Sequence, residues 1–60
     1  MRKIWYKKQR LGQWRRDDGE SKTMVSEEAM YREIGKLIPD GWKIETHGVF
    51  HTRMIELTKL

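Results

Sequence analysis

The strongest constraint on the fold is a helix whose start and end are both marked in the sequence. Ser26 is a good N-cap, because its hydroxyl can accept a hydrogen bond from a free backbone amide, and Glu27 and Glu28 follow where the helix dipole favours negative charge. Pro39 cannot continue a helix. Four apolar residues recur at helical spacing between these signals: Met30, Ile34, Leu37 and Ile38. We therefore predict one helix from Glu27 to Ile38, and we expect a close packing partner at Gly35, which would otherwise only weaken the helix interior.

The segment before the helix predicts an antiparallel hairpin. Residues 4–6 (IWY) favour strands, and Gly12 can adopt the positive φ that a tight reversal requires. A loop centred on Leu11 and this glycine would place Gln9 opposite Trp14. Two further elements follow before the helix: a turn at 17–20 (DDGE) and a short third strand over 21–25.

The segment after the helix predicts a second hairpin. Residues 42–47 alternate apolar and polar side chains, which is typical of a half-buried strand, and a three-residue loop centred on Gly48 would return the chain. This register sets four large apolar side chains on one face: Trp42, Ile44, Phe50 and Met54. Ile55 and Leu57 then fall on the opposite face, which predicts a bulge or a strand that is apolar on both sides.

Together these elements predict a single α+β domain over residues 1–60. Its order is ββ(β)αββ, with an N-terminal basic hairpin and a C-terminal hairpin in a small, mostly antiparallel sheet packed on one helix. The chain has no Cys, so a core of Trp, Ile, Leu and Met has to stabilise it without a disulfide or a Cys-based zinc site. No apolar run approaches the roughly 20 residues that span a bilayer, and no signal-peptide block follows the basic start. We expect a cytoplasmic protein without a membrane partner.

Positive charge is concentrated at the N-terminus. Residues 1–16 hold seven Lys or Arg and no acidic residue, whereas residues 17–60 hold six Lys or Arg and nine Asp or Glu, and the whole chain carries +4. Such an asymmetry indicates a basic surface with an anionic partner, either an acidic protein surface or nucleic acid. The alternative is that solvated Lys and Arg keep the strand edges from pairing with other chains.

Cationic and aromatic residues of the basic hairpin are the candidate partner-binding residues. The set is Lys7, Lys8, Arg10, Trp14, Arg15 and Arg16. The cations would steer association and pair with negative charge, and Trp14 would anchor the partner if its ring is exposed. A domain of this size needs at least two of its three Trp residues in the core. We assign Trp42 and either Trp5 or Trp14 to the core.

No cluster of residues predicts catalysis or a cofactor. The acidic residues of DDGESK (17–22) are of the kind that metal-dependent nucleases use, but in those enzymes the groups come from separate strands, and here they crowd into one turn. His47 and His51, with Glu45 nearby, are possible metal ligands, but a stable site needs fixed ligands, and solvent-facing histidines are the commoner arrangement. We expect no enzyme activity, no cofactor and no metal site.

One segment has a family resemblance. Residues 26–44, "SEEAMYREIGKLIPDGWKI", place Ala29 in the first helical turn, Pro39 ten residues later, and then an apolar–Pro–x–Gly–aromatic exit into a strand. The segment resembles the helix-to-strand unit of the small phage-encoded inhibitor of bacterial RNA polymerase made by T-odd coliphages. The resemblance covers about a third of the chain and leaves residues 1–16 without a counterpart. It implies a non-enzymatic phage protein that docks on a host machine in the bacterial cytoplasm, with its Arg and Lys meeting acidic residues.

Three hypotheses about function remain open at this point. The first is an interaction module of phage type that binds a host protein, such as a component of the transcription machinery, and inhibits or modulates it through the basic hairpin. The second is a nucleic-acid-binding module that uses the same hairpin as a ribbon or as a stacking platform. The third is a structural subunit that pairs through an exposed sheet edge.

Overall fold

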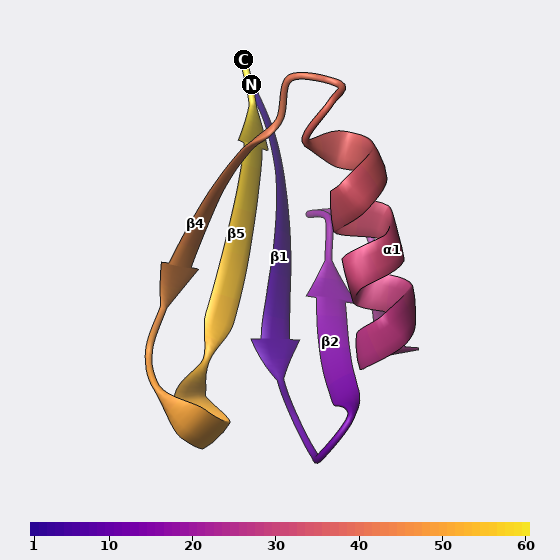
Figure 1. Cartoon of the computed structure of the whole chain (residues 1–60), viewed down its shortest axis with the longest axis vertical. Coiled ribbons are helices and arrows are strands. Elements are labelled where there is room, and N and C mark those ends of the chain that lie inside the picture. Colours follow the sequence, from indigo (N-terminus) through magenta and orange to yellow (C-terminus); the bar gives the residue numbers. More distant parts are fainter.

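An antiparallel sheet of five strands carries one helix against one of its faces (Figure 1). The computed structural model describes the whole chain, residues 1–60. The elements in chain order are β1 (Arg2–Lys8), β2 (Gln13–Asp17), β3 (Lys22–Ser26), α1 (Glu27–Leu37), β4 (Lys43–His47), the short 3-10 helix η1 (Phe50–Thr52) and β5 (Met54–Lys59). The order across the sheet is β3-β2-β1-β5-β4. The predicted α+β class is confirmed, and so is the third strand before the helix.

The helix begins where the sequence predicts and ends one residue earlier. The Ser26 hydroxyl accepts a hydrogen bond from the Ala29 N–H at 3.1 Å, so the predicted N-cap is confirmed. Leu37 is the last helical residue and Ile38 caps the end. Leu37 packs partly against the core, whereas the Ile38 side chain is 46% exposed. Met30, Ile34 and Leu37 of the predicted apolar stripe therefore contact the core, and Ile38 does not.

The core lies between the helix and the covered face of the sheet. Its eight buried residues come from both layers and from the turn after the helix: Ile4, Tyr6, Trp14, Met30, Ile34, Trp42, Ile55 and Leu57. Trp5 is half-buried and lies on the opposite face of β1. The expected core role of Trp42 is confirmed, and the second core tryptophan is Trp14.

The predicted register of the N-terminal hairpin is wrong by one residue. Trp14 lies opposite Lys8 rather than opposite Gln9. The Gln9 N–H donates instead to the Gln13 carbonyl at 3.0 Å, because the loop holds three residues, 10–12 with Gly12 at φ 74°, rather than the two on which the prediction was centred. Side chains alternate between the two faces of a strand, so this single-residue shift moves Trp14 to the face that the helix covers.

The predicted register of the C-terminal hairpin is also wrong, because the connection is longer than three residues. Residues 48–53 join β4 to β5 and include η1. Ile44 lies opposite Leu57, and the pairing continues without a bulge to the end of β4, which places Ile55 and Leu57 together in the core. Phe50 is therefore not on the sheet, and its side chain is 82% exposed.

The second face of the sheet has no helix over it, since α1 packs against the half formed by β2 and β3 on the other side (Figure 1). The open face carries the side chains of Lys3, Trp5, Lys7 and Arg15. The two edges of the sheet are β3 and β4. No helix in the fold has the length and apolar character required to cross a bilayer.

Candidate interaction site at one end of the sheet

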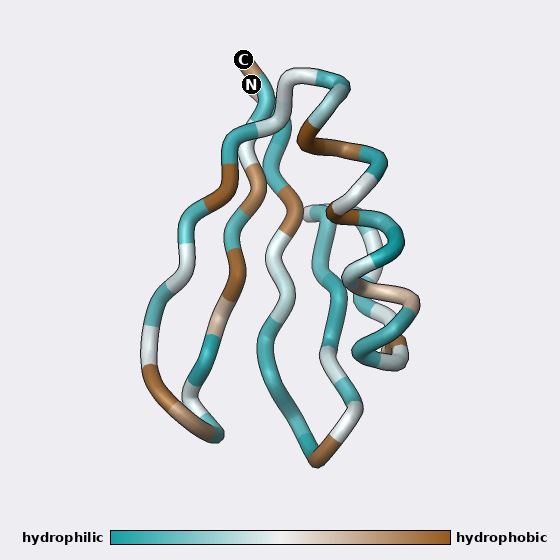
Figure 2. The backbone as a smooth tube through the Cα atoms, in the orientation of Figure 1, coloured by the Kyte–Doolittle hydropathy of each residue, from teal (hydrophilic) through white to brown (hydrophobic).

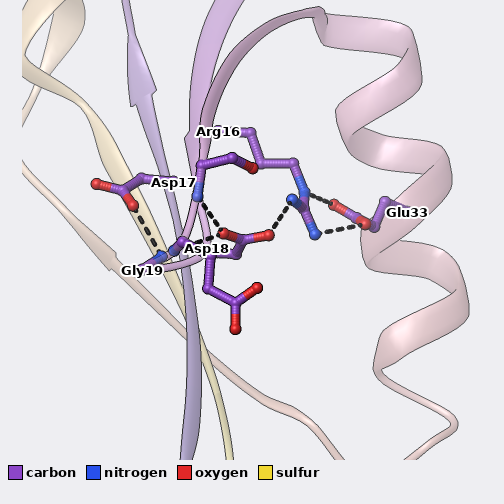
Figure 3. Close-up of polar contacts among 7 residues, drawn as sticks. Arg16, Asp17, Asp18, Gly19 and Glu33 are labelled. Atoms are coloured by element: carbon purple, nitrogen blue, oxygen red, sulfur yellow. Dashed lines mark hydrogen bonds and ion pairs between the residues drawn. The ribbon is translucent and has the colours of Figure 1, made fainter.

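Arg16, one of the predicted partner-binding residues, has a structural role in the fold. Its Nε and one terminal nitrogen donate to the two carboxylate oxygens of Glu33 at 2.8 and 3.2 Å, and the other terminal nitrogen reaches Asp18 Oδ2 at 3.1 Å. Figure 3 shows this guanidinium between the helix and the turn that follows β2. The Arg16 side chain is only 23% exposed. Its charge is compensated within the chain, so Arg16 is a tie between β2 and α1.

The acidic turn after β2 has a structural role. Asp17 Oδ1 accepts from the Gly19 N–H at 2.9 Å, and Asp18 Oδ1 accepts from the N–H groups of Glu20 and Ser21, both at 2.9 Å (Figure 3). The backbone hydrogen bonds from Ser21 and Glu20, with the nearby Arg16, lower the pKa of Asp18 to about 2. These carboxylates stabilise the turn and Arg16, which is why they crowd together in the sequence.

Trp14 is fully buried and is not available as an exposed anchor. Its exposed fraction is 0%, and its indole Nε1 donates to Glu27 Oε1 at 3.2 Å. Two cations lie near its ring: Lys8 Nζ is 5.6 Å from the ring centroid and Arg53 Cζ is 5.9 Å from it. Attraction between a cation and the π-face of a Trp ring acts over this distance. Trp14 therefore helps to position two cations at the edge of the core.

Four of the predicted cations gather at one end of the sheet, and a fifth joins them. Lys7 lies opposite Arg15 on the open face, and Arg10 is exposed in the turn between β1 and β2. The Lys8 N–H donates to the Arg53 carbonyl at 3.0 Å, which brings the loop 48–53 against the end of β1. None of the five forms an ion pair within the chain. We call Lys7, Lys8, Arg10, Arg15 and Arg53 the basic end.

The surface between the two loops is hollowed and carries no acidic residue in its lining. One hollow is lined by Lys7, Lys8, Gln9, His47, His51, Thr52, Arg53 and Met54. An adjoining hollow is lined by Lys8, Gly48, Val49, Phe50, His51 and Arg53. Both loops lie at the same end of the sheet in Figure 1. Lys7, Lys8 and Arg53 of the basic end therefore line a hollowed surface to which both hairpins contribute, and Arg10 and Arg15 lie outside the two hollows.

Sequence reasoning missed Phe50, His51 and Arg53 as parts of this surface. The short predicted loop placed Phe50 inside a strand, and nothing in the predicted register brought Arg53 near β1. The only local signal is that the segment GVFHTR (48–53) breaks the alternation of the flanking strands. Contact between this loop and β1 depends on the strand order, which the sequence pattern does not specify.

The histidines do not form a metal centre with neighbouring carboxylates. His47 Nε2 lies 3.7 Å from Glu45 Oε2 and 3.9 Å from Glu56 Oε2, and both distances are longer than a hydrogen bond. No group of three or more His, Asp or Glu side chains comes together in a way that could hold a metal ion. His51 instead lines both hollows of the basic end.

The chemistry that the basic end offers is positive charge and apolar surface. Its Lys and Arg side chains bind anions by charge and hydrogen bonding, and the exposed side chains of Val49 and Phe50 adjoin them. Such a surface is suited to recognition of an anionic macromolecule. No protein-family model, curated protein or solved structure matches the chain.

Proposed function

We propose that this protein is a non-enzymatic interaction module that binds an acidic surface of a host protein and modulates that protein. The observation that supports the proposal most is the basic end itself, where five cations from two hairpins lie at one end of the sheet and none of them is neutralised by an ion pair within the chain. Unpaired cations gathered at one end of a small domain steer association with an acidic partner and fix its orientation.

The resemblance of residues 26–44 to the phage inhibitor unit supports a bacterial host protein as the target, with the transcription machinery as the first candidate. In that unit the helix leads into a strand, and here α1 leads through Trp42 into β4. The basic end lies away from this helix-to-strand exit (Figure 1). The resemblance therefore does not extend to the proposed docking surface.

A pull-down from bacterial lysate tests the proposal. The tagged protein is compared with the double variant Lys7→Glu/Arg15→Glu, whose two positions face each other on the open face. The control is Lys22→Glu/Lys43→Glu, which makes the same charge change on the edge strands β3 and β4. We expect a discrete protein band that survives nuclease digestion and that falls at least about tenfold in the first variant only. Equal capture by both variants would contradict the proposal.

Nucleic acid is the second candidate, and the position of Trp5 favours it. Trp5 is half-buried on the open face and has Lys3 and Lys7 two residues away on either side of the same strand, which is the arrangement of a base-stacking platform. Against this, Trp5 lies opposite Glu56 in β5 and opposite Asp17 in β2, and both carboxylates repel phosphate. Capture that disappears on nuclease digestion, with a log-affinity salt slope of several phosphates for a single-stranded oligonucleotide, would favour this candidate.

The third hypothesis, pairing through a sheet edge, has less support. Both edge strands begin with a lysine, Lys22 in β3 and Lys43 in β4, and edge lysines disfavour strand addition. Sedimentation at increasing protein concentration tests it directly. Concentration-dependent dimers without any partner would revive it.

A further inference from the structure

The loop 48–53 holds a bulky residue in a backbone conformation that bulky residues avoid. Phe50 has φ 50° and is the only residue other than glycine in the chain with a positive φ. This conformation is unfavourable for a large side chain and persists only where the surroundings impose it. Strain of this kind clusters at functional sites, so the loop requires an explanation beyond connecting β4 to β5.

Hydrogen bonds within the loop impose the conformation. The Thr52 hydroxyl donates to the Val49 carbonyl at 2.7 Å and accepts from the Val49 N–H at 3.1 Å, and the Thr52 N–H donates to the same carbonyl at 3.0 Å. Gly48 completes the ring, because a Cβ atom at that position would lie 2.3 Å from the Thr52 carbonyl oxygen. These hydrogen bonds therefore close the loop backbone around Phe50.

The loop 48–53 presents apolar side chains to solvent. The side chains of Phe50 and Val49 are 82% and 66% exposed, and neither contributes to the core. The backbone tube in Figure 2 is brown at the tips of both loops at this end of the sheet. The other tip holds Leu11, which is 94% exposed. The exposure of these apolar side chains does not stabilise the folded chain. An exposed apolar patch of this kind marks a site where a partner binds.

Two cations lie beside Phe50. The hollow next to this residue is lined by Lys8 and Arg53 together with Gly48, Val49 and His51, and it has no acidic residue. Lys8 and Arg53 are held near the buried Trp14 ring at 5.6 and 5.9 Å, so their charges have a defined position next to the loop. The surface is therefore complementary to apolar groups flanked by negative charge.

We propose that Phe50 is the apolar anchor of the basic end, and that its occupant is an acidic amphipathic segment of the partner protein. Apolar side chains of that segment pack on Phe50 and Val49, and its carboxylates face Lys8 and Arg53. This inference rests on the proposed function and names the chemistry of the partner. The aliphatic Val49 and Leu11 favour protein over nucleic acid, because aliphatic groups gain most from burial against other apolar side chains. A loop whose backbone is already closed by hydrogen bonds loses less conformational freedom on binding than an open loop does.

Fluorescence anisotropy with two synthetic probes tests the inference. One labelled peptide alternates a helical stripe of Leu and Phe with Glu and Asp, and the other has the same charge but Ser in place of every apolar residue. We expect wild-type protein to bind the amphipathic peptide at least about tenfold more tightly than the Ser peptide. Phe50→Gly should remove that preference and leave weak binding of the Ser peptide unchanged. Leu60→Ala, an apolar truncation at the opposite end of the sheet where the side chain is 91% exposed, should bind as wild type does.

Phe50→Gly has a second signature that a merely structural role would not show. Glycine adopts positive φ without strain, so this variant should unfold at a higher temperature than wild type while it binds less. Equal preference for the amphipathic peptide in wild type and Phe50→Gly would overturn the inference. If Lys7→Glu/Arg15→Glu still loses both peptides in that case, the proposed function stands and only the anchor is wrong. Failure of wild type to bind either peptide overturns both.

Discussion

Lys8 and Trp14 lie directly opposite each other in β1 and β2, and the Lys8 ammonium is 5.6 Å from the centroid of the indole ring. The same ring has the Arg53 guanidinium 5.9 Å from its centroid. A fully buried tryptophan thus connects the core to two cations of the basic end. Stability and binding are therefore coupled through Trp14.

Trp14→Ala should unfold the protein. Removing a fully buried aromatic side chain costs about 3–5 kcal/mol, and a domain of this size has only a few kcal/mol of stability. Trp5→Ala is the matched control, because Trp5 is half-buried on the open face, and we expect it to remain folded. Circular dichroism during urea titration measures both. A cooperative transition for Trp14→Ala at the wild-type midpoint would show that this core assignment is wrong.

Arg15 and Arg16 are neighbours in sequence but should respond differently to truncation. Arg16→Ala breaks contacts to Glu33 and Asp18, and we expect a loss of about 1 kcal/mol in the free energy of unfolding. Arg15→Ala removes an exposed side chain without an ion pair and should change stability by less than about 0.5 kcal/mol. Chemical denaturation of the two variants checks this. If they are equally stable, the tie between β2 and α1 contributes nothing.

Acid should destabilise the protein partly through Asp18. Its folded pKa of about 2 lies below the usual pKa of 3.8 for an Asp side chain, so its contribution to stability is fully present above pH 3.8 and is lost as the pH falls towards 2. The pKa of Glu56 is lowered as well, chiefly by a hydrogen bond from Lys3, so some acid sensitivity should persist without Asp18. Urea midpoints of wild type and Asp18→Asn between pH 2 and 5 separate the two. The difference between the two proteins should shrink towards pH 2, and a constant difference would contradict the assignment.

Two glycines should respond to alanine with opposite signs. Gly48→Ala places a Cβ against the Thr52 carbonyl at a φ of 76°, and we expect a loss of more than about 1 kcal/mol. Gly35→Ala should stabilise the helix by about 0.5–1 kcal/mol, because nothing lies within 4 Å of a Cβ there. The expectation of a close packing partner at Gly35 is therefore wrong. Thermal unfolding of both variants provides the measurement. Unfolding temperatures that shift in the same direction in both variants would contradict the role assigned to Gly48 or to Gly35.

Local chemistry in the sequence was sufficient to predict several elements. The hydroxyl of Ser26, the acidic first turn and Pro39 act within a few residues of one another, so the helix could be placed to within one residue. The α+β class and the third strand followed from the alternation and turn residues on either side. The excess of cations in residues 1–16 predicted a basic surface. Five cations of that segment form no ion pair within the chain, whereas Lys3 pairs with Glu56 and Arg16 pairs with Asp18 and Glu33.

Only the tertiary structure decided the register of the two hairpins, and with it the site. A shift of one residue in the first hairpin determines whether Trp14 faces the core or the open face, and the two possibilities are equally compatible with the local pattern. The length of the loop 48–53 depends on Thr52 and Gly48 closing a ring, and this loop is what exposes Phe50 and brings Arg53 to β1. The sequence alone determined which residues prefer helix, strand or turn, because these preferences are local. Which side chains meet depends on contacts between distant strands, so the composition of the basic end emerged only when the sheet was assembled.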